Sequence, residues 1–164
     1  MGANTHTKRI GTLTTILLTG LLTGTLDALA AIAWNYKINP AKIFQFIASG
    51  VFGKQAFNGG VEMILWGLFF HYLIACSFTV VFFITYPAFI GALKNKYVTG
   101  IIFALITWVL TNLVIVPLSQ IGWRPVSVSF IVTGFGILIF TIGLPIALIA
   151  NKFYARKIPK DQTD

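Results

Sequence analysis

Three polar side chains that could do chemistry lie inside long apolar stretches of the chain: Asp27, His71 and Asn112. At 1.5 Å per helical residue, Asp27 and Asn112 lie about 10 Å, and His71 about 13 Å, from the outer ends of their stretches. An ionisable side chain inside hydrocarbon is costly to place, and it typically marks an ion or substrate path. The three residues therefore predict one polar intramembrane site, open to the outside, with Asp27 as its titrating or ligand-binding group.

A purely structural interpretation of the same residues stays open. Asp27 would hydrogen-bond to His71 or Asn112, and the cluster would only fix the packing of the helices. If the group is functional, Asp27 and His71 would titrate as a coupled pair. A water-filled cavity at Asp27 would favour the functional interpretation, and a close helix–helix contact without water would favour the packing interpretation.

Charged residues at the outer ends of the spans suggest a mouth for this site. Glu62 lies in the first turn of its span, where the helix dipole by itself favours a carboxylate. As part of a site, Glu62 would pair with Arg124 or Lys54 at the outer mouth.

Two further features concern packing. Gly20 and Gly24 form a GxxxG pair that ends one turn before Asp27, and this lets a second helix approach closely, either within the protomer or from another copy. Pro145 cannot donate to the carbonyl of Thr141, so a kink is expected in the last span.

Sequence motifs of enzymes and of cofactor sites are absent. The chain has no HExxH, GxSxG or P-loop pattern. Its apolar stretches hold one histidine and one cysteine, Cys76, which are too few for zinc, for haem ligation by two histidines or for a redox pair. We therefore expect no catalytic residue, no metal and no cofactor. An Asp27–His71 pair acting on a lipid keeps an enzymatic alternative open.

Long helices are needed to position these residues, and the composition provides them. Of the 164 residues, 57% are hydrophobic and 10% are charged, whereas a soluble domain has about 25% charged residues. Four stretches exceed the ~20 residues needed to cross a bilayer. We expect an all-α integral membrane protein in which residues 1–164 form one domain, with transmembrane helices at about 12–34, 61–86, 97–118 and 129–150.

A short helix is expected between the first two spans. Asn39 and Pro40 form a favourable helix start, so the sequence predicts a helix over about 40–52. About a dozen residues are too few to span, which makes the helix interfacial or re-entrant. Its polar face, formed by Lys42, Gln45 and Ser49, is expected to contact water.

The distribution of basic residues predicts the orientation. An even number of spans puts both termini and the middle loop on one side, which carries eight Lys and Arg residues against four on the other. More Lys and Arg on one side marks it as cytoplasmic. The net charge of +8 is therefore attributed to topology rather than to nucleic-acid binding.

Four segments carry a resemblance to a known group of proteins. They are GTLDALAA (24–31), NPAKIFQFIASGVFGKQAFNGG (39–60), GLFFHYLIA (67–75) and VPLSQ (116–120). Over most of its length the chain resembles uncharacterised bacterial four-span inner-membrane proteins that are loosely YagU-like. The resemblance implies the four-span fold and the bacterial inner (cytoplasmic) membrane, and it implies no activity.

Three classes of function agree with these features. The first is a small oligomeric transporter or channel with a polar site around Asp27. The second is a non-catalytic accessory or scaffold protein, and the third is a lipid-active membrane enzyme. The expected partners are the lipid bilayer, a second copy in a homo-oligomer and a small-molecule or ion ligand that the sequence does not identify. Nucleic acid is not expected.

Overall fold

The computed structural model describes residues 11–156, and the regular elements in that range are all helical. Four segments are long and apolar enough to cross a membrane, and a shorter helix lies between the first and the second. The predicted all-α fold with four spans and a short helix is therefore confirmed. Its elements are α1 (Thr12–Trp34), α2 (Pro40–Phe52), η1 (Gly53–Phe57), α3 (Val61–Leu93), α4 (Lys96–Val109), η2 (Leu110–Ile115), α5 (Val116–Leu118), α6 (Val128–Leu138), η3 (Ile139–Gly143) and α7 (Leu144–Ala155).

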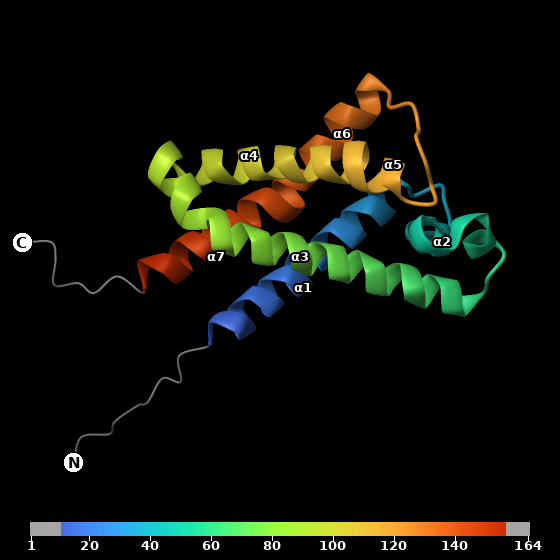
Figure 1. Cartoon of the computed structure of the whole chain (residues 1–164), viewed down its shortest axis with the longest axis horizontal. Coiled ribbons are helices and arrows are strands. Elements are labelled where there is room, and N and C mark those ends of the chain that lie inside the picture. Colours follow the sequence, from blue (N-terminus) through green and yellow to red (C-terminus); the bar gives the residue numbers. More distant parts are fainter. Residues whose placement is uncertain (1–10, 157–164) are drawn as a thin grey trace, which may run out of the picture.

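The spans form a bundle with two different ends (Figure 1). The third span runs through α4, η2 and α5, and the fourth through α6, η3 and α7. The start of α1, the α3–α4 turn and the end of α7 lie at one end, which we call the turn end. The start of α3, the helix α2 and the connection over residues 119–127 lie at the other, which we call the α2 end.

The half of the bundle nearer the turn end has a close-packed core. The rings of Phe82 and Phe103 are 4.5 Å apart, and Phe82 and Ile146 have no exposed surface. Side chains of α3, α4 and the last span fill this region, which we call the aromatic core: Phe78, Phe82, Phe83, Tyr86, Phe103, Ile142, Ile146, Ala147 and Ala150.

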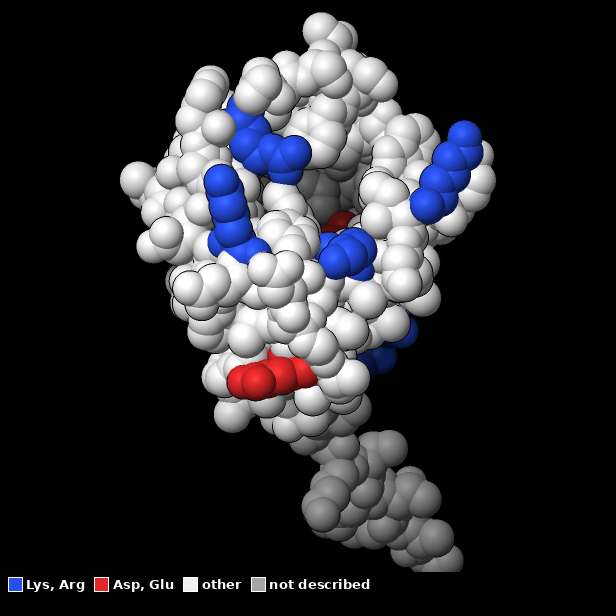
Figure 2. All heavy atoms as spheres, turned by 90° about the vertical axis from the view of Figure 1, so that its right-hand side faces the viewer, with Lys and Arg blue, Asp and Glu red and all other residues white. Residues whose placement is uncertain are grey.

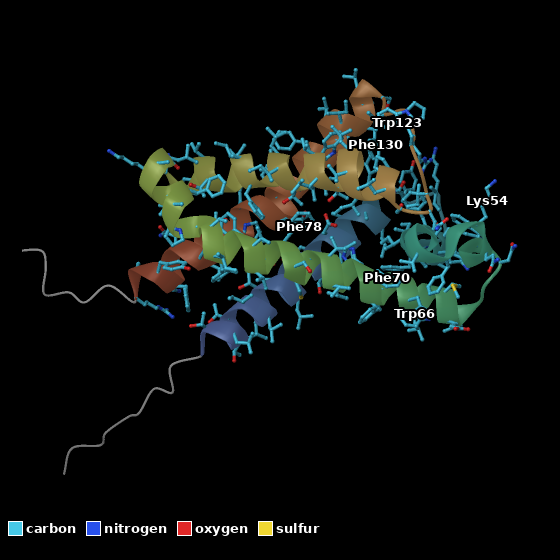
Figure 3. All side chains as sticks on the ribbon, viewed as in Figure 1. Lys54, Trp66, Phe70, Phe78, Trp123 and Phe130 are labelled. Atoms are coloured by element: carbon cyan, nitrogen blue, oxygen red, sulfur yellow. The ribbon has the colours of Figure 1, made fainter. Side chains whose placement is uncertain are left out.

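At the α2 end, α2 is docked across α3 by a backbone contact. A Cβ atom at Gly67 would overlap the backbone carbonyl of Phe44, so the two helices cross as closely as a glycine allows. Aromatic rings cover the crossing: Trp66 stacks on Phe70 at 5.6 Å, and Phe52 lies 5.7 Å from Trp66. Figure 3 shows Trp66 and Phe70 on this part of α3.

The prediction that the polar face of α2 contacts water is wrong for two of its three residues. Gln45 and Ser49 are 5% and 4% exposed. Gln45 Nε2 donates to the Gly59 carbonyl at 2.5 Å, and Ser49 Oγ donates to the Phe46 carbonyl at 2.7 Å. The docking of α2 turns these side chains toward the protein, where backbone carbonyls accept from Gln45 Nε2 and Ser49 Oγ and where Gln45 Oε1 has no partner. Of the three residues of this face, Lys42 alone is exposed.

The helix of the second span extends past the predicted span bound at about 86, because α3 continues through Pro87 to Leu93. A proline inside a helix leaves the carbonyl four residues earlier without its usual donor. Here that carbonyl belongs to Phe83, and the Tyr154 hydroxyl donates to it at 2.6 Å. A side chain from the last span thus replaces the missing backbone bond, and the helix does not need to stop.

Each of the last two spans contains a π-helical segment just before a proline. In η2 the Val116 amide donates to the Thr111 carbonyl, and Pro117 follows. In η3 the Leu144 amide donates to the Ile139 carbonyl, and Pro145 follows. The irregularity expected at Pro145 therefore takes the form of a widened turn. Such turns occur frequently at functional sites.

Candidate functional site: an intramembrane cavity

A cavity of about 490 Å³ lies among the spans, and Asp27, His71 and Asn112 all line it. They come from α1, α3 and η2, and α6 provides more of the lining residues than any other element. The other lining side chains are mainly apolar or aromatic, among them Trp34, Trp108 and Phe130. A mostly apolar cavity with a few convergent polar groups is typical of a small-molecule site.

Asp27 is half-buried in the cavity wall and is held by the fourth span. The Thr141 hydroxyl, in η3, lies 3.1 Å from Asp27 Oδ1 and 3.0 Å from the Ile137 carbonyl, so it is positioned between two acceptors. The widened turn brings this hydroxyl against α1. One neutral hydroxyl stabilises a carboxylate much less than a cation or several amides would. Asp27 therefore retains capacity to bind a donor from a ligand.

His71 joins α3 to α1 next to the acid. Its Nε2 lies 2.8 Å from the Gly24 carbonyl. A carbonyl only accepts hydrogen bonds, so Nε2 carries a proton and donates it to this carbonyl. His71 is close enough to Asp27 for an electrostatic interaction. The two residues form an acid–imidazole pair without a direct hydrogen bond.

Asn112 lines the same cavity from η2. Its Nδ2 donates to the Trp108 carbonyl at 3.0 Å, within its own span. Among the hydrogen bonds of residues 11–156, none joins Asp27 directly to His71 or Asn112. The direct bonds expected under the packing interpretation are therefore replaced by bonds to Thr141 and to two backbone carbonyls.

Two buried polar atoms in the cavity wall have no hydrogen-bond partner. They are Thr107 Oγ1 and Trp108 Nε1, and their residues are 2% and 5% exposed. Other buried threonines, such as Thr23 and Thr79, donate to the carbonyl four residues earlier. Buried polar groups are normally paired, so these two covered and unpaired atoms are an unusual feature of the cavity wall.

A second cavity of about 620 Å³ leads from the first toward the α2 end, and we call it the vestibule. Asn35, Asn112, Ser127 and Phe130 line both cavities, so the two are adjoining. Figure 2 shows the α2 end hollowed, with acidic atoms deep in the hollow and basic side chains around it. The site is therefore accessible from one end of the bundle.

The predicted outer mouth is only partly where the sequence placed it. Arg124 lines the vestibule, but Glu62 and Lys54 line neither cavity. Lys54 points outward from η1 (Figure 3), and Glu62 occupies the first turn of α3. The second basic residue of the vestibule is Lys42. No sequence signal marked Lys42 as part of the site, because its face of α2 was expected to contact water.

The aromatic core closes the cavity toward the turn end. Phe78 and Ile142 belong both to the cavity wall and to the aromatic core, and Figure 3 shows Phe78 midway along the bundle. The spans are therefore open toward the α2 end and closed toward the turn end.

The Gly20–Gly24 pair is used inside the protomer. A Cβ atom at Gly20 would lie 2.9 Å from Cys76 Sγ and 3.0 Å from Cys76 Cα, and one at Gly24 would lie 3.0 Å from the Tyr72 ring. Both glycines pack against α3, and α1 buries only this face. A homo-oligomer would therefore need another surface.

Comparisons with known proteins found no relative of this chain. A scan of protein-family models gave no match to the chain. Searches of curated proteins and of solved structures found no similar protein. Among residues 11–156, no three His, Cys, Asp or Glu side chains are grouped so that they could hold a metal ion. The chain is a small multi-pass membrane protein by its four apolar helices, and its activity has to be argued from the cavity.

Proposed function

We propose that this protein is a small membrane transporter that binds an organic molecule in the cavity at Asp27. In this proposal it resides in a bacterial inner membrane with both termini in the cytoplasm, as the count of basic residues and the YagU-like resemblance imply. The α2 end then faces outward, and the cavity takes its ligand from that side.

The observation that carries the proposal is the asymmetry of the bundle. A cavity with an acid at membrane depth opens at the α2 end, and the aromatic core blocks the turn end. Alternating access requires a central site that is open to one side and closed to the other. A channel in its conducting state would be open at both ends, so this arrangement favours a transporter.

The element best suited to move is α6. It lines the cavity, buries none of its residues and joins α7 through the π-helical η3. The backbones of Gly100 and Gly143 touch below it: a Cβ atom at Gly100 would lie 2.7 Å from the Gly143 carbonyl oxygen. This contact gives α6 a fixed base near η3. The part of the fourth span between this base and the α2 end then turns about it.

The two alternatives fit the cavity less well. A scaffold protein would present its small-residue face to a partner, but Gly20 and Gly24 are covered by α3. A lipid-active enzyme would need a nucleophile beside an available base. The hydroxyl that contacts Asp27, that of Thr141, already donates to it, and no enzyme motif surrounds it.

A thermal-shift screen on purified protein tests the proposal. Small organic cations, anions and zwitterions are compared on the wild type, on Asp27→Asn and on Glu62→Gln, which removes the other described carboxylate but lines neither cavity. We expect at least one class to stabilise the wild type and Glu62→Gln but not Asp27→Asn. The stabilising compound should enter proteoliposomes that contain the wild type. The absence of any stabilisation that depends on Asp27 would overturn the proposal.

A further inference from the structure

The vestibule and the inner cavity carry opposite charges. Lys42 and Arg124 are the charged residues that line the vestibule, and Asp27 is the acid that lines the inner cavity. The only other acid among residues 11–156 is Glu62, which lines neither. The continuous space thus has two positive groups at its mouth and one negative group at its floor.

Neither basic residue of the vestibule is neutralised by a carboxylate there. Lys42 Nζ donates to the Phe57 carbonyl at 3.2 Å and lies 5.9 Å from the centre of the Phe57 ring. The Arg124 guanidinium lies 5.1 Å from the centre of the Phe46 ring. Aromatic faces and a carbonyl position the two cations and leave donors available. Arginine and lysine together are a common pair for binding carboxylate or phosphate.

The wall between the two charged ends is mostly apolar. Phe130 lines both cavities together with the polar Asn35, Asn112 and Ser127, and Ile47 and Ile137 line the inner one. Near the floor, Thr107 Oγ1 and Trp108 Nε1 are buried without partners. Asp27 lies seven residues from the end of α1, which puts it on the order of 10 Å below that end of the helix.

We infer that the substrate is an amphipathic zwitterion, with an anionic group held by Lys42 and Arg124, an apolar body along Phe130, and an amino group at Asp27. This inference rests on the proposed transport function and names the substrate class for it. A ligand with only a cation would pass two like charges at the mouth, and a ligand with only an anion would leave Asp27 unpaired at the floor. The zwitterion satisfies both ends, and a separation of about 10 Å between its charges would match the depth of Asp27 along α1.

Three ligands of equal chain length test the inference: ω-aminooctanoate, octanoate and octylammonium. Their dissociation constants are measured on the full-length protein in a non-ionic detergent, so that the detergent carries no competing charge. We expect ω-aminooctanoate to bind about tenfold tighter than either singly charged compound.

Charge-removing variants identify which end holds which group. Lys42→Gln and Arg124→Gln should weaken ω-aminooctanoate and octanoate about tenfold each and leave octylammonium unchanged or tighter. Asp27→Asn should weaken ω-aminooctanoate and octylammonium and spare octanoate. The matched control is Lys54→Gln, which removes the same charge at the same end from a residue outside both cavities, and it should change none of the three.

The outcomes separate this inference from the proposed function. Equal affinity for ω-aminooctanoate and octylammonium, with no effect of Arg124→Gln, would overturn the zwitterion and leave an Asp27 binding site standing. If ω-aminooctanoate does not bind but another class stabilises the protein through Asp27, the inference fails and the transporter proposal survives. If no compound depends on Asp27, both fail.

Discussion

At the scale of single residues, Asp27 decides between the functional and the packing interpretation. Its hydrogen bond to Thr141 joins the first span to the fourth, so it contributes to packing in either case. Its place in the cavity with His71 adds an acid–imidazole pair that packing alone does not need. Stability and function can therefore be measured separately at this one position.

Asp27→Asn keeps an acceptor for the Thr141 hydroxyl, whereas Asp27→Leu removes it. We expect Asn to unfold at nearly the wild-type denaturant concentration and Leu to lose about 1–2 kcal/mol, the scale of hydrogen bonds in membranes. If the residue is functional, Asn should also abolish the pH response of the fluorescence of Trp34 and Trp108, which line the cavity, between about pH 5 and about pH 9. Identical pH responses of the wild type and Asp27→Asn would leave the packing role alone.

Tyr154 gives a second prediction at this scale. Tyr154→Phe removes the hydroxyl that donates to the Phe83 carbonyl and keeps the ring that stacks on Tyr86 at 5.5 Å. The carbonyl left free by Pro87 would then have no donor, so we expect a loss of about 0.6–1.7 kcal/mol in unfolding free energy. Tyr97→Phe is the control, since Tyr97 is 51% exposed. Equal losses in both variants would show that the bond does not support α3.

At the scale of elements, the crossing of α2 and α3 depends on Gly67. Alanine favours a helix by about 1 kcal/mol over glycine, but a Cβ atom at Gly67 would overlap the Phe44 backbone. We expect Gly67→Ala to destabilise the protein by about 1–3 kcal/mol through overpacking. Gly91→Ala, where a Cβ atom meets nothing within 4 Å, should be neutral or stabilising. Thermal unfolding of the two variants checks the contrast.

The sequence was sufficient to predict the helices, because span length and apolar composition are local properties. It was insufficient wherever a distant segment supplied a hydrogen bond. The second span was expected to end at Tyr86, because the tyrosine that replaces the bond lost at Pro87 lies far along the chain, in α7. The polar face of α2 was expected in water, because the acceptor of Gln45 lies beyond the helix at Gly59 and no local pattern shows that α2 docks on α3.

The candidate site was also predictable only in part from the sequence. Counting depth along each span placed Asp27, His71 and Asn112 in one layer, and all three line the cavity. Thr141, Thr107 and Trp108 were missed. A buried threonine usually donates to its own helix, so no local pattern marks the one that reaches Asp27 or the one left unpaired. Whether the site binds anything stays a prediction.

At the scale of the whole molecule, topology is the prediction on which the direction of transport depends. Single cysteines replace Lys94 in the α3–α4 turn and Lys54 in η1, in a background where Cys76 is serine. An impermeant thiol reagent on intact cells should label position 54 and spare position 94, because the side richer in Lys and Arg stays inside. Selective labelling at 94 would reverse the orientation.

The apolar part of α3 is longer than the hydrocarbon layer of a typical membrane is thick. From Met63 to Leu93 it has no charged residue, and at 1.5 Å per residue this apolar length is about 46 Å, against about 30 Å of hydrocarbon. Matching the two by tilt alone would need an inclination beyond the ~40° upper limit of membrane helices. Its neighbour α1, with 23 residues, is about 35 Å long and fits with a modest tilt. The mismatch of α3 should therefore make the protein's unfolding temperature rise as the acyl chains of the host phospholipid lengthen. A flat response across a series of chain lengths would mean that the turns after Pro87 already lie among the headgroups.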